Sequence, residues 1–205
     1  LNIVHKNKDA IIGLAGDIGY IDTVISIGYF RAALPYYCTP LLQTGCDSRF
    51  ILSEGFHPCI ENPVANSFSQ NRGMIITGSN ASGKSTFLKM TAINAILAQT
   101  VCTCTAKMYK GNYFRIYSSM SLRDNLANGE SYYIVEIKAL KRIIDAADAK
   151  DALPLLCFVD EVLRGTNTVE RIAASTQILK RLSQKGIYCF AATHDIELTH
   201  LLEQY

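Results

Sequence analysis

The segment Gly78-Ser-Asn-Ala-Ser-Gly-Lys84-Ser85 carries the residue types that bind the phosphates of a nucleotide. It lies between a short apolar strand expected at residues 74–77 and a helix expected at about residues 84–98. Glycine allows a turn whose backbone amides point at phosphate oxygens, and the helix adds the positive end of its dipole. The pattern therefore predicts that Lys84 reaches the β- and γ-phosphates and that Ser85 ligates magnesium.

The alternative is a glycine-rich turn that carries Lys and Ser by chance, and the flanking strand and helix disfavour it. The expected nucleotide-binding residues of this segment are Gly78, Ser79, Asn80, Ala81, Ser82, Gly83, Lys84, Ser85 and Thr86.

Two carboxylates follow a fully apolar run at residues 155–159. Ligands of open α/β sheets bind at the carboxyl ends of the strands, which is where Asp160 and Glu161 would lie. Asp160 is expected to hold magnesium, and Glu161 to orient and deprotonate the water that attacks the γ-phosphate. Two acids that only end a strand are the alternative. The phosphate loop argues against it, because we expect the two sites to meet across adjacent strands.

His194 follows another buried strand, expected at residues 187–192. An imidazole at this end of the sheet could sense the γ-phosphate or hydrogen-bond the attacking water. An isolated histidine is more often structural, but its position one strand after Asp160 and Glu161 favours a functional role. The expected catalytic residues are thus Lys84, Glu161 and His194.

The elements that would position these groups alternate between strand and helix, with further expected segments at 113–117, 131–147, 169–184 and from 195 onward. This alternation predicts an α/β fold with a mostly parallel sheet flanked by helices. Before it, apolar residues at steps of three and four from Ile11 predict a helix to about Leu34, which Pro35 ends. A short strand is expected at 49–52, a turn at Glu54 and Gly55, and an irregular stretch at 57–66.

Composition narrows the function classes. The net charge of the 205 residues is +2, so no strongly basic surface for nucleic acid is evident. No uninterrupted apolar run of about 18 residues and no leader pattern is seen, so we expect no membrane contact and a cytoplasmic location. The seven cysteines lack paired metal-ligand spacing and are expected to be reduced and mostly buried: Cys38, Cys46, Cys59, Cys102, Cys104, Cys157 and Cys189.

Four segments decide among the many nucleotide-hydrolysing folds. They are Ile76 to Thr86, the run Asn128-Gly-Glu-Ser131-Tyr-Tyr-Ile-Val-Glu136, residues 160–168, and Ala192-Thr-His194-Asp-Ile-Glu-Leu-Thr199. Together they resemble the ATPase domain of the MutS family, a P-loop NTPase with an ABC-like fold. His57-Pro58 resembles the short motif before that domain's nucleotide pocket. The similarity runs from about Gly55 to the end of the chain, and the first helix resembles the family's helical lever, which suggests a division into residues 1–48 and 49–205.

The resemblance implies a homodimer with composite ATP sites and magnesium as cofactor. Ser131 would reach the partner's γ-phosphate in trans, and residues 164–168 would contact the partner. Val64 matches a position where the family often places an aromatic residue against adenine. Double-stranded DNA would be bound by regions outside this chain. These features imply an ATP-gated DNA clamp of a MutS-like mismatch repair protein, from which we expect that the chain is truncated at both ends.

Departures from the family pattern suggest a divergent branch. Ser79-Asn-Ala-Ser82 replaces the usual Pro-Asn-Met-Gly, Asp124-Asn-Leu126 replaces an acidic pair, and Tyr132-Tyr133 replaces Thr-Phe. One alternative function is a transporter-type or chromosome-organising ATPase, which would carry a Leu-Ser-Gly-Gly-type helix start where Ser131-Tyr-Tyr stands. Another is a nucleotide-gated dimerisation module that hardly turns over, and Glu161 argues against it because such a switch could dispense with the base.

Overall fold

Two long apolar strands form the centre of the computed structural model, which describes residues 5–45, 49–79, 82–120, 132–149, 152–163 and 167–202. Strands β7 (Leu155–Asp160) and β8 (Ile187–Thr193) are buried along almost their whole length. With β4 (Met74–Thr77) and β6 (Arg115–Ser119) they make a parallel sheet in the order β4-β8-β7-β6. The expected α/β fold with a parallel sheet is confirmed.

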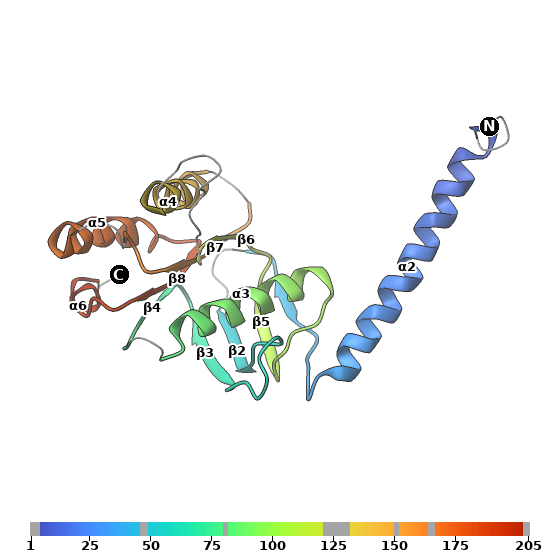
Figure 1. Ribbon diagram of the computed structural model, residues 1–205, viewed down its shortest axis with the longest axis horizontal. Coiled ribbons are helices and arrows are strands. Elements are labelled where there is room, and N and C mark those ends of the chain that lie inside the picture. Colours follow the sequence, from blue (N-terminus) through green and yellow to red (C-terminus); the bar gives the residue numbers. More distant parts are fainter. Residues whose placement is uncertain are drawn as a thin grey trace.

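Side chains of the two central strands alternate between two cores, as the two-residue period of a strand requires. Leu156, Phe158 and Phe190 point into one core with helix α3 (Lys84–Thr100). Alternate residues of the same strands point into the other core, beneath helices α4 (Tyr132–Asp148), α5 (Thr168–Arg181) and α6 (Glu197–Leu201). Figure 1 shows these three helices on one side of the parallel sheet and α3 on the other. The sheet is therefore covered on both faces.

A second, mixed sheet lies beyond α3, in the order β1-β5-β2-β3. Its strands are β1 (Leu41–Gln43), β2 (Phe50–Gly55), β3 (Asn66–Gln70) and β5 (Met108–Asn112). Only β2 was expected from the sequence, because the other three are short, polar or both. The aromatic rings of Phe50 and Phe68 meet edge to face at 5.0 Å and pack towards Phe190 of the parallel sheet. This contact joins the two sheets.

The turn expected at Glu54 and Gly55 is wrong, because both residues belong to β2. The pairing register with β3 shifts between Leu52 and Gly55, and Glu54 has a φ of 46°. Such a bulge locally disrupts the strand ladder, so Glu54 and Gly55 can belong to β2 although both residue types are uncommon in strands. A Cβ on Gly55 would lie 2.3 Å from the Leu52 side chain, so glycine is needed here for space.

The remaining helices and strands agree with the sequence-based boundaries to within a few residues. The strand expected at 113–117 begins later, at Arg115, and the last helix begins at Glu197. The long first helix, α2 (Lys8–Ala33), is confirmed despite four glycines, at none of which a Cβ would meet any atom within 4 Å.

Helix α2 projects away from the two sheets, and near its C-terminal end Arg31 contacts the segment that follows α3 (Figure 1). None of its residues is buried, and Ile11, Leu14, Ile18 and Tyr29 are among its exposed large apolar side chains. An 18-residue window has a mean hydropathy of 1.5 with at most two charged residues, so the helix could cross a membrane by length and composition. The criterion does not decide the expectation of no membrane contact, because a helix covered by other protein elements passes the same test.

Candidate nucleotide-binding and hydrolytic site

The side chain of Lys84 reaches back to the residues that follow β4. The ammonium group donates hydrogen bonds to the carbonyl oxygens of Gly78 at 2.6 Å and Ser79 at 2.7 Å. Gly83 precedes the helix in the left-handed region, at φ 91°, which a residue with a Cβ rarely adopts. Lys84 is thus held within the loop by its own backbone, where a phosphate could replace the two carbonyl acceptors.

A cavity of about 740 Å³ opens beside this loop. Its walls come from two parts of the chain: the end of β4 with the loop and α3, and residues 57–66. The second wall includes His57, Ile60, Asn62, Pro63, Val64 and Asn66. Val64 lines the cavity with 82% of its surface exposed, so it could offer an aliphatic face to a nucleotide base.

His57, in this second wall, has a neutral imidazole ring that can donate a hydrogen bond. Burial, followed by the charge of Lys89, lowers the pKa of His57 below its ordinary value of 6.5. Its Nδ1 accepts a hydrogen bond from the backbone amide of Cys59 at 3.2 Å, which assigns the proton to Nε2. The imidazole is therefore neutral at neutral pH, with one N–H group left to donate.

Buried polar contacts hold the His57 segment against α3. Asn94 of α3 is fully buried and donates from Nδ2 to Met90 O and Thr105 Oγ1, each at 3.0 Å. Its Oδ1 accepts the backbone amide of Thr105 at 2.8 Å. The Thr105 hydroxyl in turn donates to the carbonyl of Phe56 at 2.7 Å. The helix that follows the phosphate loop thereby fixes the residue next to His57, a connection that the sequence did not reveal.

The acidic pair and His194 meet at the same edge of the parallel sheet. Contrary to the expectation of adjacent strands, β8 separates β4 from β7 in this sheet. His194 follows β8 and so lies between the phosphate loop and the carboxylates. Its Nδ1 is 3.0 Å from Oε1 of Glu161, whose side chain is only 10% exposed.

Glu161 is held in an unusual backbone conformation, with a φ of 62°. Its amide donates to Ala192 O of β8 at 2.9 Å. Left-handed φ values cost non-glycine residues of the order of 1 kcal/mol and persist only where the surroundings fix them. The strain turns the chain sharply at the end of β7 and aims the carboxylate at His194.

Glu136 supports this turn from α4, and sequence reasoning did not assign it a role. Its side chain is 1% exposed, and Oε1 accepts the amide of Leu163 at 2.6 Å. Leu163 also has a left-handed φ, 58°. The only sequence signal was the place of Glu136 in the quoted run that contains Ser131.

A second unassigned pair fixes the segment after His194. Arg171 of α5 donates from Nε and Nη2 to the two carboxylate oxygens of Asp195, at 2.9 and 2.8 Å. The hydrogen bonds and charge of Arg171 lower the pKa of Asp195 below its ordinary value of 3.8. Because Asp195 adjoins His194, this bidentate pair limits where the imidazole can lie.

Magnesium ligands were expected at Ser85 and Asp160. Ser85 lies in the first turn of α3, and Asp160 ends β7 opposite Ala192. Within the described ranges no group of three or more His, Cys, Asp or Glu side chains could hold a metal by itself. One hydroxyl and one carboxylate suit magnesium, which completes its shell with waters and phosphate oxygens.

Several expected site residues lie outside the described residues: Asn80, Ala81, Ser131, and 164–166 of the partner-contacting segment. Asn167 and Thr168 are described. The Asn167 side chain caps α5 by accepting the amide of Glu170 at 3.0 Å. Thus the end of the expected partner-contacting segment also starts a helix.

The chain is similar to known proteins over almost its whole length. A family model described as MutS domain V matches residues 74–205. The DNA mismatch repair protein MutS of Thermotoga petrophila is 31% identical over 98% of this chain and 26% of that protein. The MutS proteins of Clostridioides difficile and Methanothrix thermoacetophila are 32% and 35% identical, over 98% and 97% of this chain and 22% and 24% of their own length. The chain spans about a quarter of the length of these curated relatives.

Proposed function

Since the chain belongs to the MutS family and contains its ATPase domain, domain V, we propose that it drives an ATP-gated DNA clamp in mismatch repair or a related DNA transaction. The contact between Glu161 and His194 at the sheet edge beside the phosphate loop carries this proposal. In this proposal Glu161 would act as the base, and His194 as a second polar group, for the water that attacks a γ-phosphate bound by Lys84.

Catalysis by this arrangement would be mainly positioning and charge neutralisation. Lys84 would exchange its two backbone acceptors for the β- and γ-phosphates, and the amides of residues 78–86 would surround them. Glu161 would accept a proton from the attacking water while His194 holds the carboxylate and the water in line. Magnesium held by Ser85 and Asp160 would neutralise charge on the phosphates.

Nucleotide recognition would use the second wall of the cavity. His57 would donate from Nε2, and Val64 would cover one face of the adenine. An aliphatic side chain makes less contact with a base than an aromatic ring, so we expect weaker discrimination between ATP and GTP than an aromatic residue would give.

A homodimer would complete each site. We propose that Ser131 reaches the partner's γ-phosphate and that residues 164–168 contact the partner. Glu136 supports this idea, because it joins the helix that follows Ser131 to the turn that carries Glu161.

The long helix α2 would be covered by protein that precedes it in the full-length chain. Asp17 and Asp22 lie in its central turns, and an acidic residue at the centre of a bilayer costs about 2.5 to 3.5 kcal/mol. We therefore favour a lever within the protein, in the cytoplasm, over a membrane span.

We keep the proposed division into a helical lever and an ATPase domain, but we place its boundary before Cys38 instead of after residue 48. The reason is that Cys38 and β1 already pair with Cys104 and β5 of the ATPase domain.

The decisive experiment compares full-length wild-type protein with Glu161→Gln and the control Glu54→Gln. Glu54 lies in β2 and pairs with Lys107, and neither residue lines the cavity. We expect Glu161→Gln to bind ATP, lose turnover and accumulate as an ATP-dependent dimer, and the control to behave as wild type. Unchanged hydrolysis in Glu161→Gln would contradict the assigned base.

The same samples test the role of DNA. Their mass would be measured with magnesium ATP in the presence of perfect and mismatched duplexes. An ATP-dependent change in a DNA-bound dimer supports the clamp. An ATP-dependent dimer that ignores DNA would contradict the clamp and favour an ATPase outside repair.

A further inference from the structure

Cys38 and Cys104 lie directly opposite each other across a short antiparallel bridge. Cys38 belongs to the segment between α2 and β1, and Cys104 follows the C-terminal end of α3. The amide of Cys38 donates to Cys104 O at 3.0 Å, and the amide of Cys104 donates to Cys38 O at 2.9 Å. Antiparallel residues that exchange both hydrogen bonds have Cα atoms about 5.5 Å apart. This separation lies within the range that a disulfide spans without backbone movement, about 4.4 to 6.8 Å.

The two thiols differ in a way that suits stepwise oxidation. Cys38 is half-buried, and the hydrogen bond from the Cys104 thiol lowers its pKa. Cys104 is fully buried, and the neighbouring Cys38 together with burial raises its pKa. Once Cys38 has reacted it no longer carries a thiolate, so the largest cause of the raised pKa of Cys104 disappears. An accessible nucleophile thus stands beside a shielded second thiol.

We propose that Cys38 and Cys104 form a peroxide-sensitive pair that closes to an intramolecular disulfide. The Cys38 thiolate attacks one oxygen of hydrogen peroxide and the O–O bond breaks. A sulfenic acid results, and the departing hydroxide takes up the proton that the Cys38 thiol lost and becomes water. The Cys104 sulfur then attacks the Cys38 sulfur, and the sulfenic oxygen leaves as a second water with the Cys104 proton. The two thiols lose two electrons, which the peroxide gains.

The disulfide would add a covalent link between the segments after α2 and after α3, next to hydrogen bonds from Arg31 that already join α2 to the second of these segments. Arg31, in the last turn of α2, donates to Thr103 Oγ1 at 2.8 Å and to Cys102 O at 3.1 Å. Its guanidinium also lies over the ring of Tyr37, 5.3 Å from the centroid. The segment around Cys104 therefore already binds the base of the long helix. A bond from Cys38 to Cys104 would restrict how α2 can swing about the residues that follow it.

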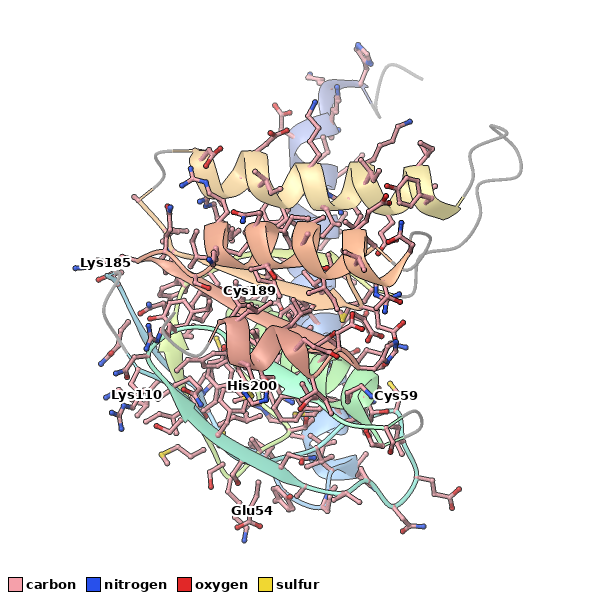
Figure 2. All side chains as sticks on the ribbon, turned by 90° about the vertical axis from the view of Figure 1, so that its left-hand side faces the viewer. Glu54, Cys59, Lys110, Lys185, Cys189 and His200 are labelled. Carbon is pink, nitrogen blue, oxygen red and sulfur yellow. The ribbon has the colours of Figure 1, made fainter. Side chains whose placement is uncertain are left out.

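The molecule contains a matched pair that should not react. Cys157 and Cys189 are register partners on β7 and β8, and their thiols also hydrogen-bond. Their exposed fractions are 0% and 7%, and they lie in the core beneath α4 and α5. In Figure 2, Cys189 lies among the inner strands, whereas the exposed Cys59 lies near the edge of the molecule. Proximity of two thiols is common to both pairs, and access to an oxidant distinguishes them.

The test treats full-length, fully reduced protein with hydrogen peroxide, blocks the remaining thiols by alkylation, and maps the cysteine peptides by mass spectrometry. We expect a peptide cross-linked between Cys38 and Cys104 that dithiothreitol reverses, while Cys157 and Cys189 are recovered alkylated after unfolding. Cys38→Ser should lose the cross-link, and Cys157→Ser should keep it. In Cys104→Ser, a sulfenic acid reagent such as dimedone should label Cys38.

Three results would overturn the proposal. They are Cys38 joined to the exposed Cys102 or to another cysteine, both thiols recovered alkylated after exposure to peroxide, and a cross-link in the buried pair instead. The wild-type mapping needs no variant to fold and no ATP hydrolysis, so its outcome is independent of the proposed function.

Discussion

Replacing Asn94 with alanine tests whether the phosphate-loop helix holds the His57 segment. The substitution removes the acceptor of the Thr105 amide and the donors to Thr105 Oγ1 and Met90 O. A buried amide left without a partner costs about 1 to 3 kcal/mol, and each further lost hydrogen bond about 1 kcal/mol. Because Asn94 is fully buried, we expect the free energy of unfolding to fall by about 3 to 5 kcal/mol.

The assay is urea denaturation of the 205-residue chain followed by circular dichroism, because the sequence contains no tryptophan. For a chain of this size the loss corresponds to a fall in melting temperature of roughly 10 °C. Thr100→Ala is the control: it removes an exposed hydroxyl on the same helix that bonds only to Ile96 O. We expect the control to change stability by less than about 0.5 kcal/mol.

A second measurement separates positioning from stability alone. Thr105 donates to Phe56 O, next to His57, so loosening Asn94 should raise the KM for ATP more than it lowers kcat, at a temperature where the variant is folded. If stability fell by less than about 1 kcal/mol, or if KM matched the Thr100→Ala control, the reasoning from this network would be refuted.

Three further predictions concern the loop and its supports. Lys84→Ala should weaken ATP binding about tenfold or more, measured by titration with a fluorescent nucleotide, because charge-assisted bonds contribute about 1.5 to 3 kcal/mol each; unchanged affinity would exclude its contact with the phosphates. Glu136→Ala should leave the Leu163 amide unpaired in the core and lower kcat without changing ATP affinity, and Glu136→Gln, which keeps an acceptor, should restore much of the rate. The lowered pKa of Asp195 means that its pair with Arg171 stabilises the fold above the unfolded pKa near 3.8, and that this contribution is lost as the pH falls below that value. Asp195→Asn should therefore be less stable than wild type at pH 7 and differ from it less at pH 3, and an equal difference at both pH values would contradict the ion pair.

The parts of the candidate site that the sequence predicted are made of residues that are neighbours in the chain. The phosphate loop is contiguous, so spacing alone places Gly78, Gly83 and Lys84 in one turn before a helix. The same holds for Asp160 and Glu161 at the end of an apolar strand. Long apolar runs also predicted the central strands, because a strand that is buried on both faces consists almost entirely of apolar residues.

The parts that were missed depend on distant pairs and on strand order. Glu136 meets Leu163, and Arg171 meets Asp195, only because α4 and α5 cover the same face of the sheet. Strand alternation predicts a parallel sheet but not its order, so the insertion of β8 between β4 and β7 was not anticipated. That insertion is what brings His194 to Glu161.

Contacts with β8, His194 and α4 hold the turn after β7. A movement of any of these parts would therefore change the position of Glu161. Its amide is bound by Ala192 of β8, its carboxylate faces His194, and the Leu163 amide is bound by Glu136 of α4. Left-handed φ values at Glu161 and Leu163 leave this turn few alternative conformations. We therefore expect a shift of α4 along its axis to move Glu161, because the turn has few other conformations that could absorb the shift.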